Sequence, residues 1–458
     1  MKRRAVIIIG LLIAISGTIN AQLIFDKSEY IRRREKLMDL IPDGVAVFRG
    51  APLPEGVSQF FQYNNIMYFA GLEIPDVILI IDGVKRTSTL FFTITESGAK
   101  NEGISVELVK DPGSFTGIEK VLPYDQFTPV LTSLVKESPI IYTLFKADEL
   151  IGEVSAEKYN NLKKSMTDNE WDGRLTREIQ FVSKLHEKYP AAVVKDCSNI
   201  VSDLRKIKSP AEIEIMRETG KIGVKAHLAF MKAVAVNVKE KYLASLFQYT
   251  CKKEDAQEIA YSTIIMSGEN MPYGHYNRYN RTFEDGDFII LDAGPSYKYY
   301  VVDISTSMPA NGKFTPKQKE LYELANGIRE VCIKSFKPGI TFGQVGQNVK
   351  KYLTDNGFNP EEERFRGIIR LGGYNHSIGM VVHDGMGTFL GSDEVLKEGF
   401  VFACDINMIY ADIEIGIRLE DTVLITKDGC ELLSAGLPRT VNGVESTMKK
   451  TDNHLTEG

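Results

Sequence analysis

The chain has 458 residues, of which 43% are hydrophobic and 25% are charged, and this length allows two globular domains, each with its own core. A formal net charge of −6 and the lack of a lysine-rich stripe argue against a nucleic-acid-binding protein. The five cysteines are scattered and form no CxxC pair or Cys/His cluster, which argues against a disulfide framework and a thiolate zinc site.

The N-terminus has the pattern of a signal peptide. Lys2, Arg3 and Arg4 precede an apolar run at residues 5–17, and small residues with a plausible cleavage site after Ala21 follow. We therefore expect a signal peptide at residues 1–21, export to the periplasm or the cell exterior, and no stable membrane anchor after cleavage. The alternative is an N-terminal membrane anchor, for which the apolar run is short.

A first domain is predicted at residues 22–205. Residues 27–39 are charged and helix-like, and strand-like runs follow at the positions 44–48, 76–81, 89–94 and 140–144. These runs alternate with amphipathic stretches, which predicts an α/β domain. No histidine or cysteine lies between Gln22 and Leu185, so we expect this domain to act as a scaffold, to make oligomer contacts or to shape a cleft.

A second domain is predicted at residues 206–440. Ser209, Pro210 and Glu212 form a capping box with proline at the first helical position, which marks the start of an entry helix. Further helices are predicted after Pro316 and at residues 342–353, and strands flank both, so the domain is α+β. From Val441 onward the apolar spacing is lost, and we expect residues 441–458 to be a disordered tail.

Two acids in the second domain have an unusual context. The apolar run 288–291 ends on Asp292, and Asp303 follows eleven residues later. If Tyr297 and Lys298 form the tip of a two-residue hairpin, the two acids lie opposite each other, about 5 Å apart, and repel. A cation between them would relieve the repulsion, so the pair predicts a metal site, although either acid alone could cap a turn.

The same half of the chain carries further groups suited to such a site: His275, His376, His383, Asp405, Arg418 and Glu420. Arg418 and Glu420 lie on one face of a predicted strand. Oxygen ligands with one imidazole suit paired Mn, Co, Zn or Fe ions, which support hydrolysis. Taken singly, His376 could be a core histidine and Arg418 the partner of an acid, but several acids buried together without a cation would be costly. We assign the remaining histidines to structure or solvent: His227 to structure, and His186 and His454 to solvent.

The candidate ligands, in their order and spacing, resemble those of the dinuclear pita-bread metallopeptidases, above all the Xaa-Pro aminopeptidase and prolidase branch: Asp292, Asp303, His376 and Glu420. Further segments are similar to the same family: residues 266–270, 275–276, 285–287, 291–294, 312–315, 382–384 and 416–421. Residues 68–81 are similar to its creatinase-type N-terminal domain, and residues 207–213 to its domain boundary. The resemblance implies an α/β creatinase-like domain followed by an α+β pita-bread catalytic domain.

The resemblance also implies a site and a reaction. It implies two divalent metal ions, manganese first and cobalt or zinc as alternatives, held by five residues: Asp292, Asp303, His376, Asp405 and Glu420. Asp303 and Glu420 would bridge the ions, and a hydroxide between the ions would attack the carbonyl before proline. His275 and His383 would bind the substrate and the developing oxyanion, and Arg418 would orient ligands or a substrate carboxylate. The expected partners are a proline-containing peptide and a second copy of the chain in a homodimer.

Two positions depart from the family pattern. Asp405, Ile406 and Asn407 replace Glu-Pro-Gly, so the acid that serves as ligand and general base is one methylene shorter. Gly372 replaces the first histidine of His-Gly-x-x-His, a position that commonly lines the proline pocket. We expect an exported metal-dependent Xaa-Pro aminopeptidase. The alternative is a metal-free creatinase-like hydrolase, or a catalytically impaired binding protein, on the same scaffold.

Overall fold

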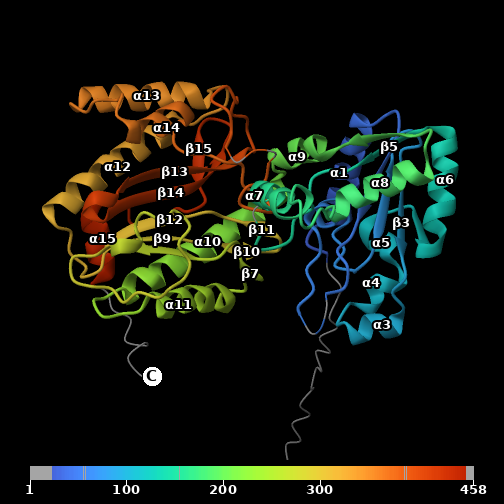
Figure 1. Cartoon of the computed structure of the whole chain (residues 1–458), viewed down its shortest axis with the longest axis horizontal. Coiled ribbons are helices and arrows are strands. Elements are labelled where there is room, and N and C mark those ends of the chain that lie inside the picture. Colours follow the sequence, from blue (N-terminus) through green and yellow to red (C-terminus); the bar gives the residue numbers. More distant parts are fainter. Residues whose placement is uncertain are drawn as a thin grey trace, which may run out of the picture.

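The structure is a computed structural model that describes residues 23–449 except 55, 57, 154, 386 and 388. The predicted signal peptide at residues 1–21 and the last nine residues of the predicted tail lie outside the described residues. The chain forms two halves, each built around its own sheet (Figure 1). Within the described part of the chain, no helix combines the length and the apolar character needed to cross a membrane.

The N-terminal half contains a six-stranded sheet in the order β4-β3-β2-β1-β5-β6. Its strands are β1 Val45–Arg49, β2 Ile78–Asp82, β3 Thr87–Phe92, β4 Lys120–Pro123, β5 Ile140–Thr143 and β6 Val193–Asp196. The β1–β2 and β2–β3 pairs are antiparallel, and the remaining pairs are parallel. The four predicted strands correspond to β1, β2, β3 and β5. The two strands that were not predicted lie at the sheet edges and are partly exposed, so they lack the long apolar runs of the inner strands.

The helices of this half are α1 Lys27–Leu40, α2 Asn64–Ala70, α3 Glu96–Asn101, α4 Val106–Lys110, α5 Pro112–Thr116, α6 Phe127–Glu137, α7 Ser155–Leu162, α8 Arg177–Lys188 and α9 Ser198–Lys206. Helices pack on both faces of the sheet. Leu131 of α6 and Leu185 of α8 pack with Val47 on one face. Leu37 of α1 and Phe69 of α2 pack in the core of the other face. The predicted α/β character of this half is confirmed.

The second half contains a sheet in the order β13-β14-β12-β9-β8, with β15 paired to β14. Its strands are β8 Ile264–Ser267, β9 Phe288–Asp292, β12 Ser305–Pro309, β13 Val401–Tyr410, β14 Ile415–Ile425 and β15 Cys430–Leu432. A small second sheet, in the order β11-β10-β7, lies beside it: β7 Glu258–Ile259, β10 Pro295–Tyr297 and β11 Tyr300–Val301. Its helices are α10 Pro210–Ala233, α11 Glu240–Lys253, α12 Pro316–Ser335, α13 Phe342–Asp355, α14 Glu363–Leu371 and α15 Val441–Met448.

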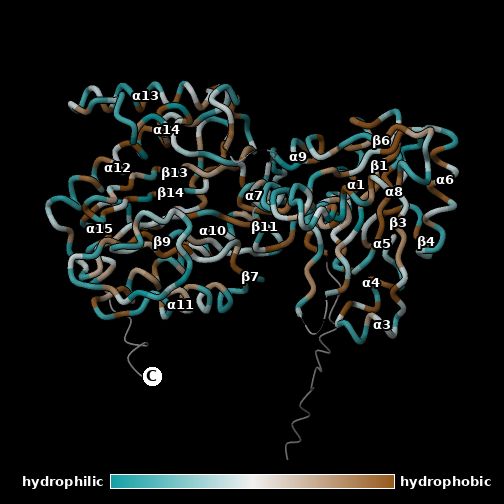
Figure 2. Tube along the Cα trace, in the orientation of Figure 1, coloured by the Kyte–Doolittle hydropathy of each residue, from teal (hydrophilic) through white to brown (hydrophobic). Residues whose placement is uncertain are grey.

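Alternation along the strands separates a core face from a polar face. Leu291 of β9 and Ile406 of β13 point into a core shared with helices α10 to α14. Successive side chains of a strand point to opposite faces, so the neighbouring Asp292 and Asp405 lie on the other face of the sheet. Teal and brown alternate along α13, as expected for a helix with one buried face (Figure 2). The predicted α+β character of this half is confirmed.

The predicted entry helix is α10, and its capping box is present. The Ser209 hydroxyl accepts a hydrogen bond from the Glu212 amide at 3.2 Å, and the Glu212 carboxylate accepts one from the Ser209 amide at 2.9 Å. The two further predicted helices correspond to α12 and α13, which also begin with capping boxes, at Thr315 and Thr341.

The prediction of disorder from Val441 is wrong for residues 441–448, which form α15. Thr440 caps the helix, and Val441, Val444 and Met448 are buried on its inner face. Glu445 forms an ion pair with Lys313 at 2.7 Å. Three apolar residues at helical spacing are enough to dock a two-turn helix onto an existing core, a signal too short to stand out among the polar residues of this segment.

The predicted hairpin register is also wrong. Tyr297 pairs with Tyr300, so the two-residue turn is Lys298 and Tyr299, and both of these residues have the positive φ that a type I′ turn requires. The turn is held here because the buried Tyr299 hydroxyl donates to Glu73 at 2.6 Å and accepts from the Gln62 amide at 3.0 Å. These partners belong to the N-terminal half, so the local sequence could not reveal them.

His227, assigned to structure, is buried on α10 between β9 and β12. Its Nε2 lies 2.9 Å from the Ala293 carbonyl oxygen and its Nδ1 lies 3.1 Å from the Thr306 hydroxyl. Burial lowers the pKa of this imidazole to about 4. The unfolded chain, with a pKa of about 6.5, therefore binds more protons than the folded chain at mildly acidic pH.

We predict that His227 contributes stability that is fully present above about pH 6.5 and is lost as the pH falls toward 4, by roughly 3 kcal/mol. Replacing it (H227Q) removes this titration, so the free energy of unfolding of the variant should depend less steeply on pH in this window. Denaturant titrations at several pH values measure the effect, with H186Q at an exposed histidine as the control. Equal slopes for wild type and H227Q would contradict the prediction.

Candidate active site

The acids of the second half lie in one row across the sheet. Asp292 of β9 pairs with Ser305 of β12, Ser305 pairs with Glu420 of β14, and Glu420 pairs with Asp405 of β13. Asp303 precedes Ser305 by two residues and so lies diagonally beside Asp292 on the same face. All four carboxylates are buried. The sequence thus predicted that Asp292 and Asp303 lie close together, but with the wrong cross-strand partner for each.

The guanidinium of Arg418 lies among these acids. Arg418 Nε donates to Asp405 Oδ2 at 3.0 Å, and Nη1 pairs with Asp292 Oδ2. Nη2 lies 3.7 Å from Glu420 Oε2, which confirms that Arg418 and Glu420 share a strand face. Four carboxylates with one arginine leave an excess of buried negative charge.

Three of the predicted ligands form a cluster that fits a cation. Asp303, His376 and Glu420 each offer one ligand atom, and these atoms all lie within 4.8 Å of one another. His376 Nε2 is 3.6 Å from Asp303 Oδ2 and from Glu420 Oε1, too long for hydrogen bonds but compatible with an ion about 2 Å from each atom. Glu420 Oε1 is buried and has no hydrogen-bond partner among the described residues. The residues of this cluster therefore fit a divalent cation.

A backbone hydrogen bond on the far side of the ring fixes the orientation of His376. Its Nδ1 lies 2.6 Å from the Val382 carbonyl oxygen, so Nδ1 carries the proton and Nε2 presents a lone pair to the two acids. Such a backbone carbonyl is a common outer partner of metal-binding histidines.

Burial and the charges of the neighbouring groups shift the pKa values of these acids. Burial raises the pKa of Asp303 well above its usual range, and Glu420 and Asp292 raise it further. Burial also raises the pKa of Asp405, although Arg418 opposes the effect. For Glu420, burial acts in the same direction, but Arg418 and His376 outweigh it and lower the pKa. A bound divalent cation would favour the ionised form of every acid in the row.

Tyr261 belongs to the site, although nothing in the sequence distinguished it. Its hydroxyl lies 2.5 Å from Asp292 Oδ1 and also bonds to Asp303. Burial raises the pKa of this phenol well above its usual value, and Asp292 and Asp303 raise it further, so Tyr261 remains a hydrogen-bond donor. It follows the short strand β7 as an isolated tyrosine, without a motif that would indicate its role.

Two further predicted histidines lie at the same cavity. The rings of His376 and His383 meet edge to face, with centroids 4.2 Å apart. Burial, with smaller contributions from His376 and His275, lowers the pKa of His383 to about 2, so its imidazole is neutral. Its Nδ1 is buried and has no hydrogen-bond partner in the part of the chain that the structure describes. His275 lies on the rim and is exposed.

The cavity has a volume of about 250 Å³ and is lined from both halves of the molecule. Its lining includes Tyr261, His275, Asp292, Asp303, His376, His383 and Arg418. Gly152 contributes from the N-terminal half. The N-terminal half therefore helps to shape the site. Shaping a cleft is one of the three roles predicted for it.

Gly372 serves helix termination. It ends α14 with a φ of +63°, and a Cβ added there would lie 2.6 Å from the Phe342 carbonyl oxygen. The first histidine of the family motif could not occupy this position unless the backbone moved.

We predict that removing the Tyr261 hydroxyl (Y261F) weakens the binding of divalent cations by about tenfold, because Asp292 and Asp303 lose a shared donor that orients them. Isothermal titration with manganese measures the affinity. The matched control is Y279F, whose hydroxyl donates to the Thr263 carbonyl oxygen at 2.5 Å and touches none of the candidate ligands. An unchanged affinity in Y261F would contradict the prediction.

Known proteins match both halves of the chain. Residues 214–427 match the family model for metallopeptidase family M24, and residues 30–142 match that for the N-terminal domain of aminopeptidase P. The Xaa-Pro aminopeptidase of Escherichia coli K12 is 26% identical over 465 residues, which covers 92% of this chain and 98% of the relative. The Xaa-Pro dipeptidase of Pyrococcus horikoshii is 30% identical over 254 residues, which covers 56% of this chain and 70% of the relative.

Solved structures share the fold. Aminopeptidase P from E. coli, in a complex with the inhibitor Pro-Leu, superposes with a TM-score of 0.72 at 23% identity, covering 93% of this chain and 99% of that one. Proline aminopeptidase P II from Yersinia pestis gives 0.73 at 24% identity, covering 93% and 100%. The predicted creatinase-type domain followed by a pita-bread domain is confirmed. From the two matched domains and the full-length relatives, we conclude that the chain belongs to metallopeptidase family M24, in its Xaa-Pro aminopeptidase branch.

Proposed function

We propose that the protein is an exported, metal-dependent aminopeptidase that hydrolyses the N-terminal Xaa-Pro bond of peptides. The observation that carries the proposal is the cluster of Asp303, His376 and Glu420 beside a cavity, with a buried Glu420 oxygen that no described residue hydrogen-bonds. Relatives that cover nearly the whole chain carry this activity in their names. Family M24 peptidases use divalent metals.

The metal-binding residues we propose are the four acids of the row and one imidazole: Asp292, Asp303, Asp405, Glu420 and His376. Manganese is our first choice, with cobalt or zinc as alternatives, because four of the five residues are hard oxygen donors. When bound, such ions supply Lewis acidity for the hydrolysis of a carbonyl group. Asp292 and Asp405 now pair with Arg418, so a second ion would compete with this guanidinium for them.

His275, His383 and Arg418 would bind and orient the substrate. His383 is neutral, and its buried Nδ1 has no partner among residues 23–449 as described, which suits it to donate a hydrogen bond to the developing oxyanion. His275, on the exposed rim, would bind the peptide backbone. Arg418 would orient the acids or a substrate carboxylate through charge-assisted hydrogen bonds.

The size of the cavity suits the end of a peptide. Pockets for drug-sized ligands hold roughly 300–1,000 Å³, and this cavity, at about 250 Å³, takes a shorter segment. Gly152 from the N-terminal half lines it together with the catalytic groups, which fits cleavage near a chain end.

Export and dimerisation are also proposals. The charged and apolar pattern of residues 1–21 supports export, and the N-terminal sequence of the exported protein would test it. The family resemblance supports a homodimer, for which the molar mass in solution is the test.

The second candidate is a metal-free creatinase-like hydrolase or a catalytically impaired binding protein. The observation that favours it is the pairing of Arg418 with Asp292 and Asp405, because a guanidinium then neutralises acids that a second metal would need. The shorter reach of Asp405 points in the same direction.

We predict that the purified protein contains about two transition-metal ions per chain, and that stripping them abolishes Xaa-Pro cleavage until manganese is restored. Elemental analysis and a proline-peptide assay, with the matching alanine peptide as the specificity control, measure both quantities. A protein that is free of metal but active would support the creatinase-like candidate. A protein that is free of metal and inactive even after reloading would support the binding protein.

Asp405 offers a separate test of the site. If reach limits activity, D405E should raise the rate of Xaa-Pro cleavage, because a misplacement of 1 Å can cost about a hundredfold. The rate constant kcat on the same peptide is the measurement. The conservative change D421E is the control, since Asp421 pairs with Arg329 and Arg439 away from the cavity. A large loss of activity in D405E would instead show that the backbone has already adapted to aspartate.

A further inference from the structure

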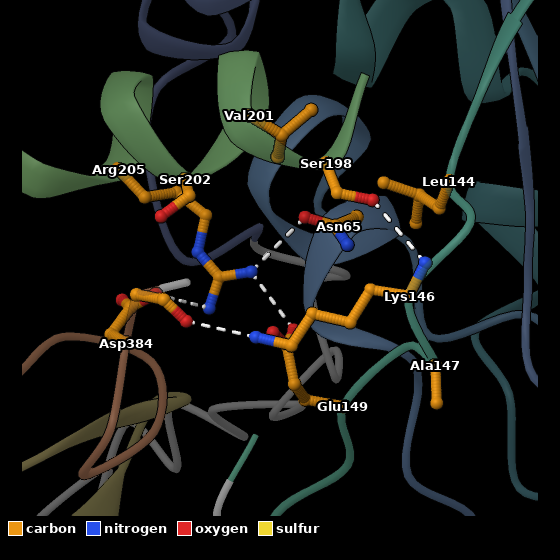
Figure 3. A pocket seen from close by; sticks show the side chains of 11 residues that line it. Asn65, Leu144, Lys146, Ala147, Glu149, Ser198, Val201, Ser202, Arg205 and Asp384 are labelled. Atoms are coloured by element: carbon orange, nitrogen blue, oxygen red, sulfur yellow. Dashed lines mark hydrogen bonds and ion pairs between the residues drawn. The ribbon is translucent and has the colours of Figure 1, made fainter. Parts of the chain in front are cut away.

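A second buried charge cluster, which shares no residue with the acid row, lies between the two halves. Figure 3 shows its side chains. Its centre is Arg205, at the end of α9. Only 3% of this residue is exposed. Arg205 Nη2 lies 2.8 Å from Asp384 Oδ1, and Nη1 lies 2.9 Å from Glu149 Oε2 and 3.0 Å from Asn65 Oδ1. The adjoining cavity, of about 20 Å³, holds no more than about one water, so this cluster is a set of contacts rather than a ligand site.

Asp384 organises the segment that carries two of the active-site histidines, residues 376–385, which we call the histidine loop. The Asp384 amide donates to the Ser377 carbonyl oxygen at 2.8 Å, and its Oδ2 accepts from the Met380 amide at 2.9 Å. A Cβ at Gly379 would lie 2.1 Å from Asp384 Oδ2, so the loop closes tightly around this carboxylate.

The two ends of the histidine loop are held from different sides. At the start, the His376 carbonyl oxygen accepts from the Ala403 amide at 2.9 Å, which ties this end to β13. At the other end, Arg205 reaches Asp384, and Lys146 Nζ donates to the Gly385 carbonyl oxygen at 2.8 Å. Both of these cations belong to the N-terminal half, so the position of His383 depends on contacts across the domain boundary.

Arg205 also holds the N-terminal segment that reaches the active-site cavity. Its partner Glu149 lies three residues before Gly152, which lines that cavity. Asn65 connects the same parts, since its amide donates to Asp148 Oδ1 at 2.7 Å while its carbonyl oxygen accepts from Arg205. One buried guanidinium thus joins the segment carrying Gly152 to the loop carrying His383.

We propose that Arg205 is a positioning residue of the active site: through Asp384 it sets the place of His383 and His376, and through Glu149 it sets the wall of the cavity opposite them. The assignment rests on the proposed peptidase function. A buried ion pair acts in this way because removing one partner leaves the other charge uncompensated, and the loop must then move to solvate it.

The variants R205Q and D384N test the proposal, with R33Q as the matched control. Arg33 is also a buried arginine between the halves: its Nη1 donates to the Tyr68 carbonyl oxygen at 3.0 Å and its Nη2 lies 3.4 Å from Glu212 Oε1. Within the described part of the chain, these contacts do not involve the histidine loop. We expect R205Q and D384N to lower kcat by roughly 10- to 100-fold while KM changes far less, because the displaced groups act on the transition state. R33Q should reduce thermal stability without this fall in kcat.

A readout without catalysis separates this proposal from the proposed function. In protein labelled with nitrogen-15 in its histidine rings, the signals of His376 and His383 should shift in R205Q and D384N and stay in place in R33Q. If R205Q does not fold, D384N alone tests the proposal. The side-chain oxygen of the new asparagine can still accept a hydrogen bond from the backbone amide of Met380. Unchanged histidine signals in the folded variants, or an equal fall in kcat in R33Q, would overturn the proposal. A wild-type protein without peptidase activity would refute only the proposed function, since the ring signals would still decide the role of Arg205.

Discussion

The structure of the second half depends on one electrostatic constraint: four buried carboxylates share a sheet face with the guanidinium of Arg418. Like charges at this spacing repel strongly in a poorly solvated interior, so such a row persists only with cations to balance it. The row follows from the alternation of side chains along a strand. Leu291 and Ile406 point toward the helices, so the next residue in β9, Asp292, and the preceding residue in β13, Asp405, point to the opposite face. Arg418 supplies one positive charge, and the cluster around His376 fits the cation that the remaining acids require.

Much of the fold and of the candidate site could be predicted from the sequence, because the patterns that indicate them are local. The apolar run that ends on Asp292 predicted β9 and its terminal carboxylate, and the capping box at Ser209 predicted the start of α10. Family motifs supplied the order of the ligands. The hairpin register was predicted wrongly because the buried Tyr299, which fixes the turn, is held by Glu73 and Gln62 more than two hundred residues earlier in the chain. Turn propensity carries no information about such distant partners.

The features of the site that the sequence did not reveal depend on long-range contacts. Tyr261 becomes part of the site only when β9 brings Asp292 to its hydroxyl, and Arg205 becomes relevant only when the halves meet at Asp384. Neither residue belongs to a periodic pattern. The helix over 441–448 escaped notice for a related reason, since three apolar residues identify a helix only once a core is present to receive them. Together these contacts make the site a product of both halves.

The central claim is that the buried acids hold a divalent cation with His376. The most direct measurement is anomalous diffraction from crystals of the manganese-loaded protein. The predicted result is an anomalous peak about 2 Å from Asp303, from Glu420 and from His376 Nε2. No peak at that position, with Arg418 still paired to Asp292 and Asp405, would contradict the account.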